Sequence, residues 1–323
     1  MSLTAALFPG QGSHRPGMAT AWEGHPAHAT FDEVGRTIGL DLVRLADDAE
    51  TCATTAVAQP VVYAASIAAW RALTDAGVTV DVTAGHSLGE VAACVAAGSL
   101  SIADGAQLVT ERGRAMGRAC RGSRGGMVAV IGLDAAAVGR LHDWLDGPGR
   151  DATIANDNAP GQVVLAGPHD ALERAEAHAV RLGGRCRALT VEGAFHTTAM
   201  SPAMVAVHEV ARRLTFAPPT LTWLRGRDAA AVPDGAGAAR ALVEGVLAPV
   251  NWRGVQTELV ERGVTHAIEV GPGGVLRGLA KRAMPDVTVA TLDGREALDA
   301  LGIDLTDRPH QADRDRPEVP AWA

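Results

Sequence analysis

Residues 85–90 read Gly85-His86-Ser87-Leu88-Gly89-Glu90, a Gly-x-Ser-x-Gly frame. The stretch before it, residues 78–84, is strand-like, and the small residues at 91–97 predict a helix after it. A serine between a strand and a helix, with a glycine on either side, is typical of a nucleophile elbow, because the turn is too sharp for larger side chains. Ser87 is therefore a candidate nucleophile, and the first N–H groups of the following helix point toward any oxyanion formed there.

Composition and charge exclude several other classes of protein. The chain has 323 residues, 47% of them hydrophobic, which is enough for one large domain with an inserted or appended part. Its net charge of −8 argues against binding to nucleic acid or to an anionic membrane surface. No apolar stretch is long enough to span a bilayer and the first residues lack the basic start of a secretory signal, so we expect a cytoplasmic protein. Four widely spaced cysteines without a Cys-x-x-Cys pair argue against a disulfide framework and a cysteine zinc site: Cys52, Cys94, Cys120 and Cys186.

Residues 125–191 have the pattern of a separate unit. Strand, helix, strand, strand, helix and strand are predicted at residues 127–132, 134–145, 152–155, 162–166, 169–182 and 185–191. This is the order of a ferredoxin-like subdomain. We therefore expect it to be inserted into a larger domain.

The flanking segments predict an α/β core made of residues 1–124 and 192–292. Strand-like segments precede glycine-rich turns at residues 5–8, 82–85 and 265–270 and alternate with helical stretches. This alternation predicts a mostly parallel sheet with helices on both faces. After residue 292 the apolar pattern fades, so we expect residues 293–323 to be a flexible tail.

An elbow serine needs a base, because a neutral hydroxyl is a poor nucleophile. His196 lies where the inserted unit returns to the core, and so at the rim of a cleft. A purely structural histidine is the alternative. His86 adjoins Ser87, but neighbours along a turn point apart, so we expect His86 to brace the elbow.

Arg112 lies on the apolar face of a helix predicted from Ser101 to Cys120, which begins with a Ser101-x-x-Asp104 capping box. A buried guanidinium needs an anion. That anion is either an internal carboxylate, in a salt bridge, or the carboxylate of a substrate, which the guanidinium fork matches in two parallel hydrogen bonds. The sequence leaves both open.

A glycine-rich turn at residues 8–14 follows the first predicted strand. It lacks the Gly-Lys-Ser/Thr of a phosphate loop. Placed beside the elbow, it would supply a second N–H to an oxyanion. The similar turn at residues 271–274 lacks the spacing of a dinucleotide fingerprint, and we interpret it as structural.

Six motifs occur in order between residues 5 and 292: Gly10-Gln11-Gly12-Ser13, Gly85-His86-Ser87-Leu88-Gly89-Glu90, Arg112-Gly113-x-x-Met116, Asn158-x-Pro160-Gly161-Gln162, Gly193-Ala194-Phe195-His196 and Glu269-Val270-Gly271-Pro272-Gly273. In these motifs the chain resembles the malonyl-CoA:acyl-carrier-protein transacylases of fatty-acid synthesis and the related acyltransferases of polyketide synthases. The resemblance implies an α/β-hydrolase-like core with a ferredoxin-like insert. It also implies transfer of malonyl from malonyl-CoA to the phosphopantetheine thiol of an acyl carrier protein, through a malonyl-serine and without a metal or organic cofactor.

The resemblance assigns roles to the residues of the catalytic machinery. Ser87 would be the nucleophile and His196 its base, oriented by a main-chain carbonyl near Asn251. Backbone N–H groups of Gln11 and Leu88 would form the oxyanion hole.

The same resemblance implies a substrate pocket. Arg112 would hold the free malonyl carboxylate, and Gln59, His86 and Phe195 would line the pocket. The ring of Phe195 would fill the space that a methyl group on C2 of the acyl chain would need. Two positions depart from the family pattern, because His14 stands in place of the usual glutamine and Ala248 in place of the usual asparagine.

Four arginines follow Arg112 on the same helix and on the link to the inserted unit: Arg114, Arg118, Arg121 and Arg124. We expect this basic surface to dock an acidic carrier protein. The alternative is a solvated helix end, where cations favour the C-terminal dipole.

Three other functions remain open from the sequence. A serine thioesterase or other hydrolase would share the serine, the histidine and the oxyanion hole. A trans-acting polyketide-type acyltransferase would use another acyl group or acyl carrier. A binding relative would have lost its activity.

Overall fold

The structure, a computed structural model, describes residues 2–49, 54–122 and 124–305. Cys52 and the tail beyond residue 305 lie outside the described residues. The first part of the core comprises β1 (Leu3–Phe8), η1 (Gln11–Ser13), η2 (Thr20–Trp22), η3 (Pro26–His28), α1 (Ala29–Ile38), α2 (Leu42–Asp47), α3 (Thr55–Asp75), β2 (Val82–Gly85), α4 (Gly89–Ala96) and α5 (Ile102–Arg121).

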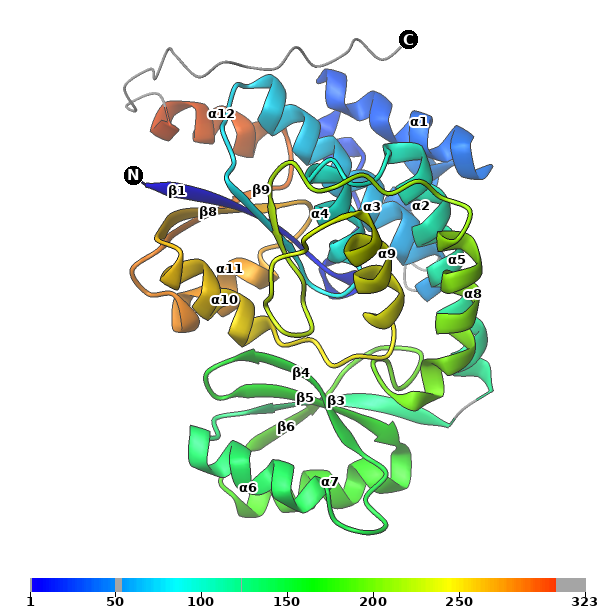
Figure 1. Ribbon diagram of the computed structural model, residues 1–323, viewed down its shortest axis with the longest axis vertical. Coiled ribbons are helices and arrows are strands. Elements are labelled where there is room, and N and C mark those ends of the chain that lie inside the picture. Colours follow the sequence, from blue (N-terminus) through cyan, green and yellow to red (C-terminus); the bar gives the residue numbers. More distant parts are fainter. Residues whose placement is uncertain (1, 50–53, 123, 306–323) are drawn as a thin grey trace.

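The chain then forms the inserted subdomain and returns to the core (Figure 1). The subdomain contains β3 (Gly125–Ile131), α6 (Ala135–Leu145), β4 (Thr153–Ala159), β5 (Gln162–Pro168), α7 (His169–Arg181) and β6 (Arg185–Ala188). The second part of the core contains η5 (Thr198–Met200), α8 (Ser201–Ala211), β7 (Thr222–Leu224), α9 (Gly235–Glu244), α10 (Trp252–Glu261), β8 (Val264–Val270), α11 (Val275–Ala283), β9 (Thr288–Leu292) and α12 (Arg295–Leu305).

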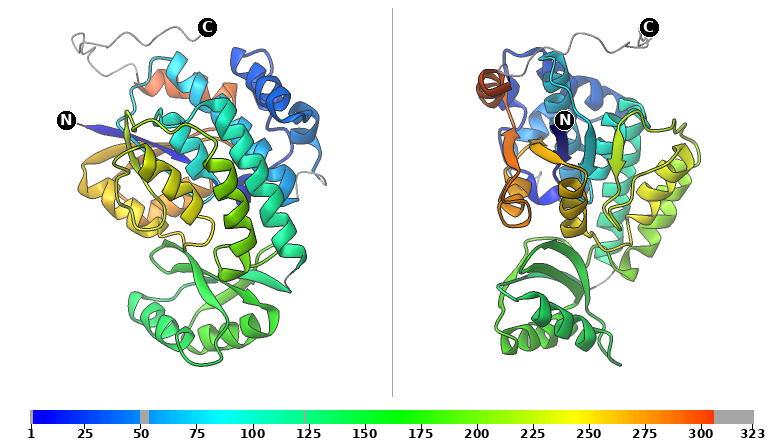
Figure 2. Two further views of the ribbon diagram at one scale, coloured as in Figure 1. Left: turned by 45° about the vertical axis from the view of Figure 1, so that its right-hand side comes forward. Right: turned by 60° about the vertical axis from the view of Figure 1, so that its left-hand side comes forward.

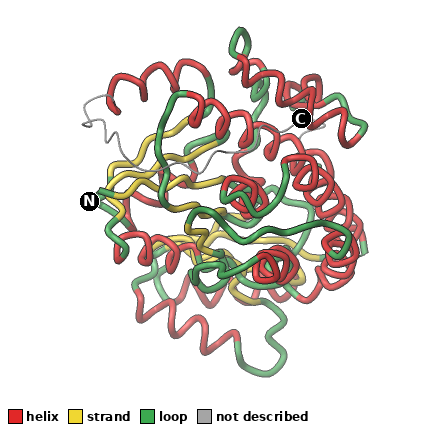
Figure 3. Tube along the Cα trace, turned by 45° about the horizontal axis from the view of Figure 1, so that its top comes forward, coloured by secondary structure: helices red, strands yellow, loops and turns green. Residues whose placement is uncertain are grey.

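The core sheet is parallel throughout, in the order β7-β2-β1-β8-β9. Strand β1 lies in its centre, with Phe8 beside Gly85 of β2 and Leu7 beside Glu269 of β8. Because parallel strands end at one edge of the sheet, the glycine-rich turns after β1, β2 and β8 come together at that edge. Helices surround the strands in Figure 3.

Side chains of β1 alternate between two cores, as expected for a strand covered on both faces. Ala6 and Phe8 belong to the larger core, which includes side chains of α3, α4 and α5. Ala5 and Leu7 belong to a second core with side chains of α10 and α11. Helices on both faces explain why five of the six residues of the strand are apolar.

The inserted subdomain has its own antiparallel sheet, in the order β4-β5-β3-β6. Helices α6 and α7 cover its outer face and enclose a separate core that includes Val128, Leu141 and Leu165. The views in Figure 2 place the other face of this sheet next to the main body, where β4 packs on α10. The mixed α/β fold with a second, separate sheet was predicted from the sequence and is confirmed. The boundaries at residues 124 and 191 stay predictions.

The expectation of a flexible tail from residue 293 was wrong for its first part. Residues 295–305 form α12, in which Leu301 is buried and Ala297 and Leu298 pack on the main core. This short apolar face was too brief to stand out among the charged residues around it. Among the described residues, no helix is long and apolar enough to cross a membrane.

Candidate active site

The Gly-x-Ser-x-Gly turn connects β2 to α4. Ser87 adopts a backbone conformation that residues other than glycine rarely adopt. Its φ angle is +53°, in the left-handed region. A Cβ added to Gly85 would lie 2.1 Å from the carbonyl carbon of Gly89, and one added to Gly89 would lie 2.1 Å from the carbonyl oxygen of Phe8. A side chain at either position would clash with the main chain, so both residues must be glycine. The strained serine is held above the sheet edge.

His196 meets Ser87 from the segment that follows the inserted subdomain. Its Nε2 lies 2.7 Å from Ser87 Oγ, and its Nδ1 lies 2.9 Å from the carbonyl oxygen of Ala248. The neutral tautomer with its proton on Nδ1 donates to that carbonyl and leaves Nε2 to accept from the serine hydroxyl. His196 also has a positive φ, +57°. Two strained residues facing each other form a serine–histidine dyad with a main-chain carbonyl as its third member.

The carbonyl that orients His196 is not near Asn251, as the resemblance implied, but three residues earlier. Both main-chain groups of Val250 are taken by the inserted subdomain, because its N–H donates to Ala155 and its carbonyl accepts from Asp157. The Ala248 carbonyl faces the histidine instead. Asn251 is the N-cap of α10, and its side chain accepts from the N–H of Gly254 at 3.0 Å. Because the orienting group belongs to the main chain, the departure from the family pattern at Ala248 does not remove it.

The surroundings of His196 keep its imidazole neutral. Only 3% of the residue is exposed. Burial, and then the charges of Arg112 and His86, lower the pKa of His196 to about 3, although the Ala248 carbonyl favours the protonated form. A neutral imidazole that accepts from the serine is the state required of a general base.

Arg112 projects from α5 into the same site, and 4% of the residue is exposed. Its Nη1 donates to Gln59 Oε1 at 2.9 Å, and its Nη2 donates to Ser87 Oγ at 3.1 Å. Within the described ranges, no carboxylate forms an ion pair with it. Burial lowers the pKa of Arg112 to about 10, and the charge of Glu90 acts against this shift. A guanidinium that remains cationic and is directed at the serine matches an acyl group bearing a carboxylate.

The turns that contain Gln11 and Leu88 lie against each other. A Cβ added to Gly10 would lie 2.9 Å from the carbonyl oxygen of His86, and the N–H of His86 donates to Phe8 at 2.9 Å. Gln11 is the first residue of η1, and Leu88 directly precedes α4. The first N–H groups of a helix have no acceptor within it. Both residues therefore stand at helix starts, and the role of their N–H groups in an oxyanion hole stays a prediction.

The remaining predicted pocket residues are distributed around the dyad. Gln59 is buried on α3 and bridges Arg112 and Met116, since its Nε2 lies 3.5 Å from Met116 Sδ. Phe195 precedes the catalytic candidate His196 and is buried in the main core. His86 is held by Asn158, with Nε2 and Oδ1 2.8 Å apart. This contact fits the bracing role for His86, whose assignment to the substrate pocket stays a prediction.

Two polar residues near the dyad were given no role from the sequence. Asn158 of β4 holds His86, and its presence in the Asn-x-Pro-Gly-Gln motif was the available signal. Glu90 of α4 is buried and accepts from the N–H of Gly226 at 2.5 Å. Burial raises the pKa of Glu90 to about 7. A carboxylate at the start of a helix of small residues was the signal for that position.

The four arginines proposed for docking are exposed: Arg114, Arg118, Arg121 and Arg124. Arg118 is paired with Glu111 at 2.5 Å. A groove of about 500 Å³ lies between α5 and the segment after His196, lined by Arg118, Thr198 and small residues of both segments. The described residues include no group of three or more His, Cys, Asp or Glu side chains with metal-binding geometry.

Comparisons with known proteins agree with this arrangement. The acyl transferase domain family matches residues 6–300. The chain is 38% identical over 307 residues to the malonyl CoA-acyl carrier protein transacylase of Salmonella typhimurium, which covers 93% of this chain and 99% of the relative.

Two solved structures are similar over nearly their whole length. The acyl carrier protein S-malonyltransferase of Vibrio cholerae superimposes with a TM-score of 0.88 at 34% identity, covering 93% of this chain and 100% of that one. A malonyl-transacylase in complex with a type II PKS acyl-carrier protein gives a TM-score of 0.87 at 32% identity, covering 94% and 100%.

Proposed function

This chain belongs to the acyl transferase family, and we propose that it moves malonyl from malonyl-CoA to an acyl carrier protein through an ester on Ser87. It is an acyltransferase, and in the proposed mechanism Ser87 is the nucleophile of two half-reactions. The observation that supports the malonyl group is Arg112, whose buried guanidinium lies 3.1 Å from Ser87 Oγ and is not paired with a carboxylate among the described residues. In a malonyl ester on Ser87, the free carboxylate is separated from the ester carbonyl by one methylene group, within reach of the guanidinium.

The first half-reaction begins when Ser87 Oγ attacks the thioester carbonyl and His196 Nε2 takes the hydroxyl proton. The Ala248 carbonyl stabilises the imidazolium that forms, and the N–H groups of Gln11 and Leu88 hold the tetrahedral oxyanion. Collapse breaks the carbon–sulfur bond. The proton on Nε2 passes to the sulfur, and coenzyme A leaves as the thiol.

The second half-reaction runs in the opposite sense. The phosphopantetheine thiol gives its proton to His196 and attacks the malonyl ester. The same oxyanion site is used, and collapse returns the proton to Ser87 as the carbon–oxygen bond breaks. Arg112 holds the carboxylate throughout, which keeps the acyl group oriented between the two steps.

Trapping the acyl-enzyme by mass spectrometry tests the proposal directly. Incubation with malonyl-CoA alone is expected to yield a stable malonyl adduct on Ser87 that a holo carrier protein removes. Rapid loss of the adduct to water would indicate a hydrolase, and no adduct at all would indicate a binding protein. Carriers of fatty-acid and of polyketide synthesis both present this thiol, so the same assay with each carrier assigns the pathway.

The low pKa of His196 predicts an unusual pH profile for acylation. Protonation of the imidazole abolishes the base, and the pKa of His196 is lowered from 6.5 to about 3. The neutral form therefore persists as the pH falls, and kcat/KM for acylation should stay level down to about pH 5. Acetyl-CoA is the control substrate. It has no carboxylate, so titration of the substrate does not contribute to its pH profile. A half-maximal rate near pH 6.5 with both substrates would contradict the expectation.

Phe195 is expected to exclude branched acyl groups. Its buried ring occupies the space that a methyl on C2 would need, and a pocket rejects one methyl by roughly 1–3 kcal/mol. The wild-type enzyme should therefore prefer malonyl-CoA to methylmalonyl-CoA by about 5- to 160-fold in kcat/KM, and Phe195→Ser should reduce that preference. Equal use of both substrates by the wild-type enzyme would argue against this role.

We further propose that the carrier docks over α5, beside the groove lined by Arg118 and Thr198. Reversing two exposed cations with Arg118→Glu and Arg121→Glu should raise the KM for the carrier about tenfold and weaken its salt dependence. The rate of acylation by malonyl-CoA should not change.

A matched control reverses two exposed arginines on the outer helices of the inserted subdomain, Arg140→Glu and Arg174→Glu. The change in net charge is the same, so an equal rise in carrier KM would reflect overall charge and not docking. Arg277, Lys281 and Arg282 would then be the next surface to test. Location in the cytoplasm and the absence of a nucleic-acid partner stay predictions.

A further inference from the structure

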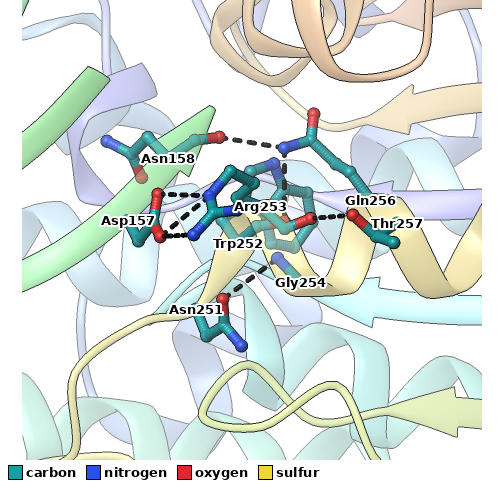
Figure 4. Close-up of polar contacts among 8 residues, drawn as sticks. All are labelled: Asp157, Asn158, Asn251, Trp252, Arg253, Gly254, Gln256 and Thr257. Atoms are coloured by element: carbon teal, nitrogen blue, oxygen red, sulfur yellow. Dashed lines mark hydrogen bonds and ion pairs between the residues drawn. The ribbon is translucent and has the colours of Figure 1, made fainter. Parts of the chain in front are cut away.

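We propose that Asp157, Asn158 and Arg253 are positioning residues that hold strand β4 of the inserted subdomain against α10, and thereby align the dyad (Figure 4). They touch neither Ser87 nor His196. They act through two groups that do, the Ala248 carbonyl and the turn that contains His86. The inference rests on the proposed function only where the test measures malonyl transfer.

The first connection is through the main chain of β4. Val250 donates its N–H to Ala155 at 2.8 Å and accepts from the N–H of Asp157 at 2.9 Å, a parallel bridge that joins the two units. Only Pro249 separates Val250 from Ala248, whose carbonyl holds His196 at 2.9 Å. A shift of β4 along α10 therefore moves the group that orients the base.

The second connection is through the buried side chain of Asn158. Its Oδ1 lies 2.8 Å from His86 Nε2, and its carbonyl accepts from Gln256 Nε2 of α10 at 2.9 Å. The ring of His86 also packs edge-on against Trp252, with centroids 5.5 Å apart. Ser87, with its strained φ of +53°, directly follows His86. Asn158 thus connects the elbow to α10, the helix that directly follows the segment of the first connection.

Arg253 and Asp157 fix the register of the two elements. Three short contacts of 2.6–3.0 Å join the guanidinium to both carboxylate oxygens. The arginine side chain is 50% exposed, so the pair adds little to the free energy of unfolding. Its bidentate geometry instead specifies one relative placement of β4 and α10. The Asn251 cap fixes where α10 begins, as Figure 4 shows.

Loss of this placement should slow chemistry without weakening substrate binding. Misplacement of catalytic groups by about 1 Å costs on the order of 10²-fold in rate. Arg112 and Gln59 lie on α5 and α3, outside both β4 and α10, so we expect the carboxylate site to be unchanged. We expect kcat to fall in both half-reactions, because one dyad serves both, and KM for malonyl-CoA to stay the same.

The test compares Arg253→Met with Arg262→Met in the full-length enzyme. Arg262 is the matched control, because it is also an exposed arginine and pairs with Glu258 of α10 at 2.7 Å. It caps the C-terminal end of α10, whereas Arg253 lies in the first turn of that helix. Two rates are measured: kcat for malonyl transfer, and labelling of Ser87 by a fluorophosphonate, which needs the dyad but neither malonyl nor carrier. Arg253→Met should lower both about tenfold and Arg262→Met neither, while Asn158→Ala should lower both by about 10²-fold.

A double substitution that restores the ion pair tests whether the loss of activity in Arg253→Met comes from the placement of β4 against α10. The exchange Asp157→Arg with Arg253→Asp should restore labelling to within about threefold of wild type, because it rebuilds the pair with reversed partners. The inference is overturned if Arg253→Met labels as fast as Arg262→Met, or if KM rises with kcat unchanged. If Asn158→Ala does not fold, the exposed Arg253 pair still decides the question. A wild-type enzyme that labels normally but transfers no malonyl would refute the proposed function alone.

Discussion

Replacing Ser87 by alanine is expected to abolish malonyl transfer and covalent labelling by malonyl-CoA. The substitution removes only the hydroxyl group, whose Oγ lies 2.7 Å from His196 Nε2 and 3.1 Å from Arg112 Nη2. Without a nucleophile neither half-reaction proceeds, and loss of such a serine typically costs on the order of 10⁴–10⁶-fold in kcat. Stopped-flow acylation and mass spectrometry of the intact protein measure the two effects.

Ser99→Ala is the matched control for this substitution. Ser99 is a buried serine, and its Oγ has no hydrogen-bond partner in the described part of the chain. Its replacement removes the same atom and should leave both acylation and the free energy of unfolding nearly unchanged. A malonyl adduct that persists in Ser87→Ala at another residue would move the nucleophile there.

Replacing Arg112 by alanine is expected to remove the selectivity for carboxylated acyl groups. Loss of one partner of a buried charge pair costs about 2–5 kcal/mol, or roughly 30- to 5,000-fold in kcat/KM for malonyl-CoA. Acetyl-CoA has no carboxylate for the guanidinium to hold, so its slow transfer should fall much less. The ratio of the two kcat/KM values measures the effect.

Two controls accompany the Arg112 experiment. Arg114→Ala removes an exposed arginine from the same helix α5 and should leave the ratio unchanged. Equal losses for malonyl-CoA and acetyl-CoA in Arg112→Ala would instead indicate a structural role, through the hydrogen bonds from Arg112 to Gln59 and Ser87. Arg112→Lys should restore activity only in part, because an ammonium lacks the planar fork.

Local sequence chemistry was sufficient for much of the site. Gly85 and Gly89 lie so close to neighbouring main-chain atoms that no side chain would fit. A steric requirement of this kind can be recognised from a short sequence motif. The strand-like segments before the turns, the order of elements in the insert and an arginine on an apolar helix face follow from periodicities of two and 3.6 residues. These features depend on neighbours along the chain.

Contacts between distant segments could not be obtained this way. Ser87 and His196 are 109 residues apart, and only the return of the chain from the inserted subdomain brings them to 2.7 Å. The carbonyl that orients His196 was placed near Asn251 from the sequence. The structure moves it to Ala248, because pairing of Val250 with β4 decides which main-chain groups remain free.

The amino-acid sequence by itself thus determined the nucleophile candidate, the α/β class and the family, since all three are properties of short motifs and of their order. Only the tertiary structure showed the burial that lowers the pKa of His196, the absence of a carboxylate partner for Arg112 among the described residues, and the pairing of Val250 with β4. Burial and electrostatic interaction depend on distances in space, which residues far apart in the chain acquire only when the core and the insert pack together.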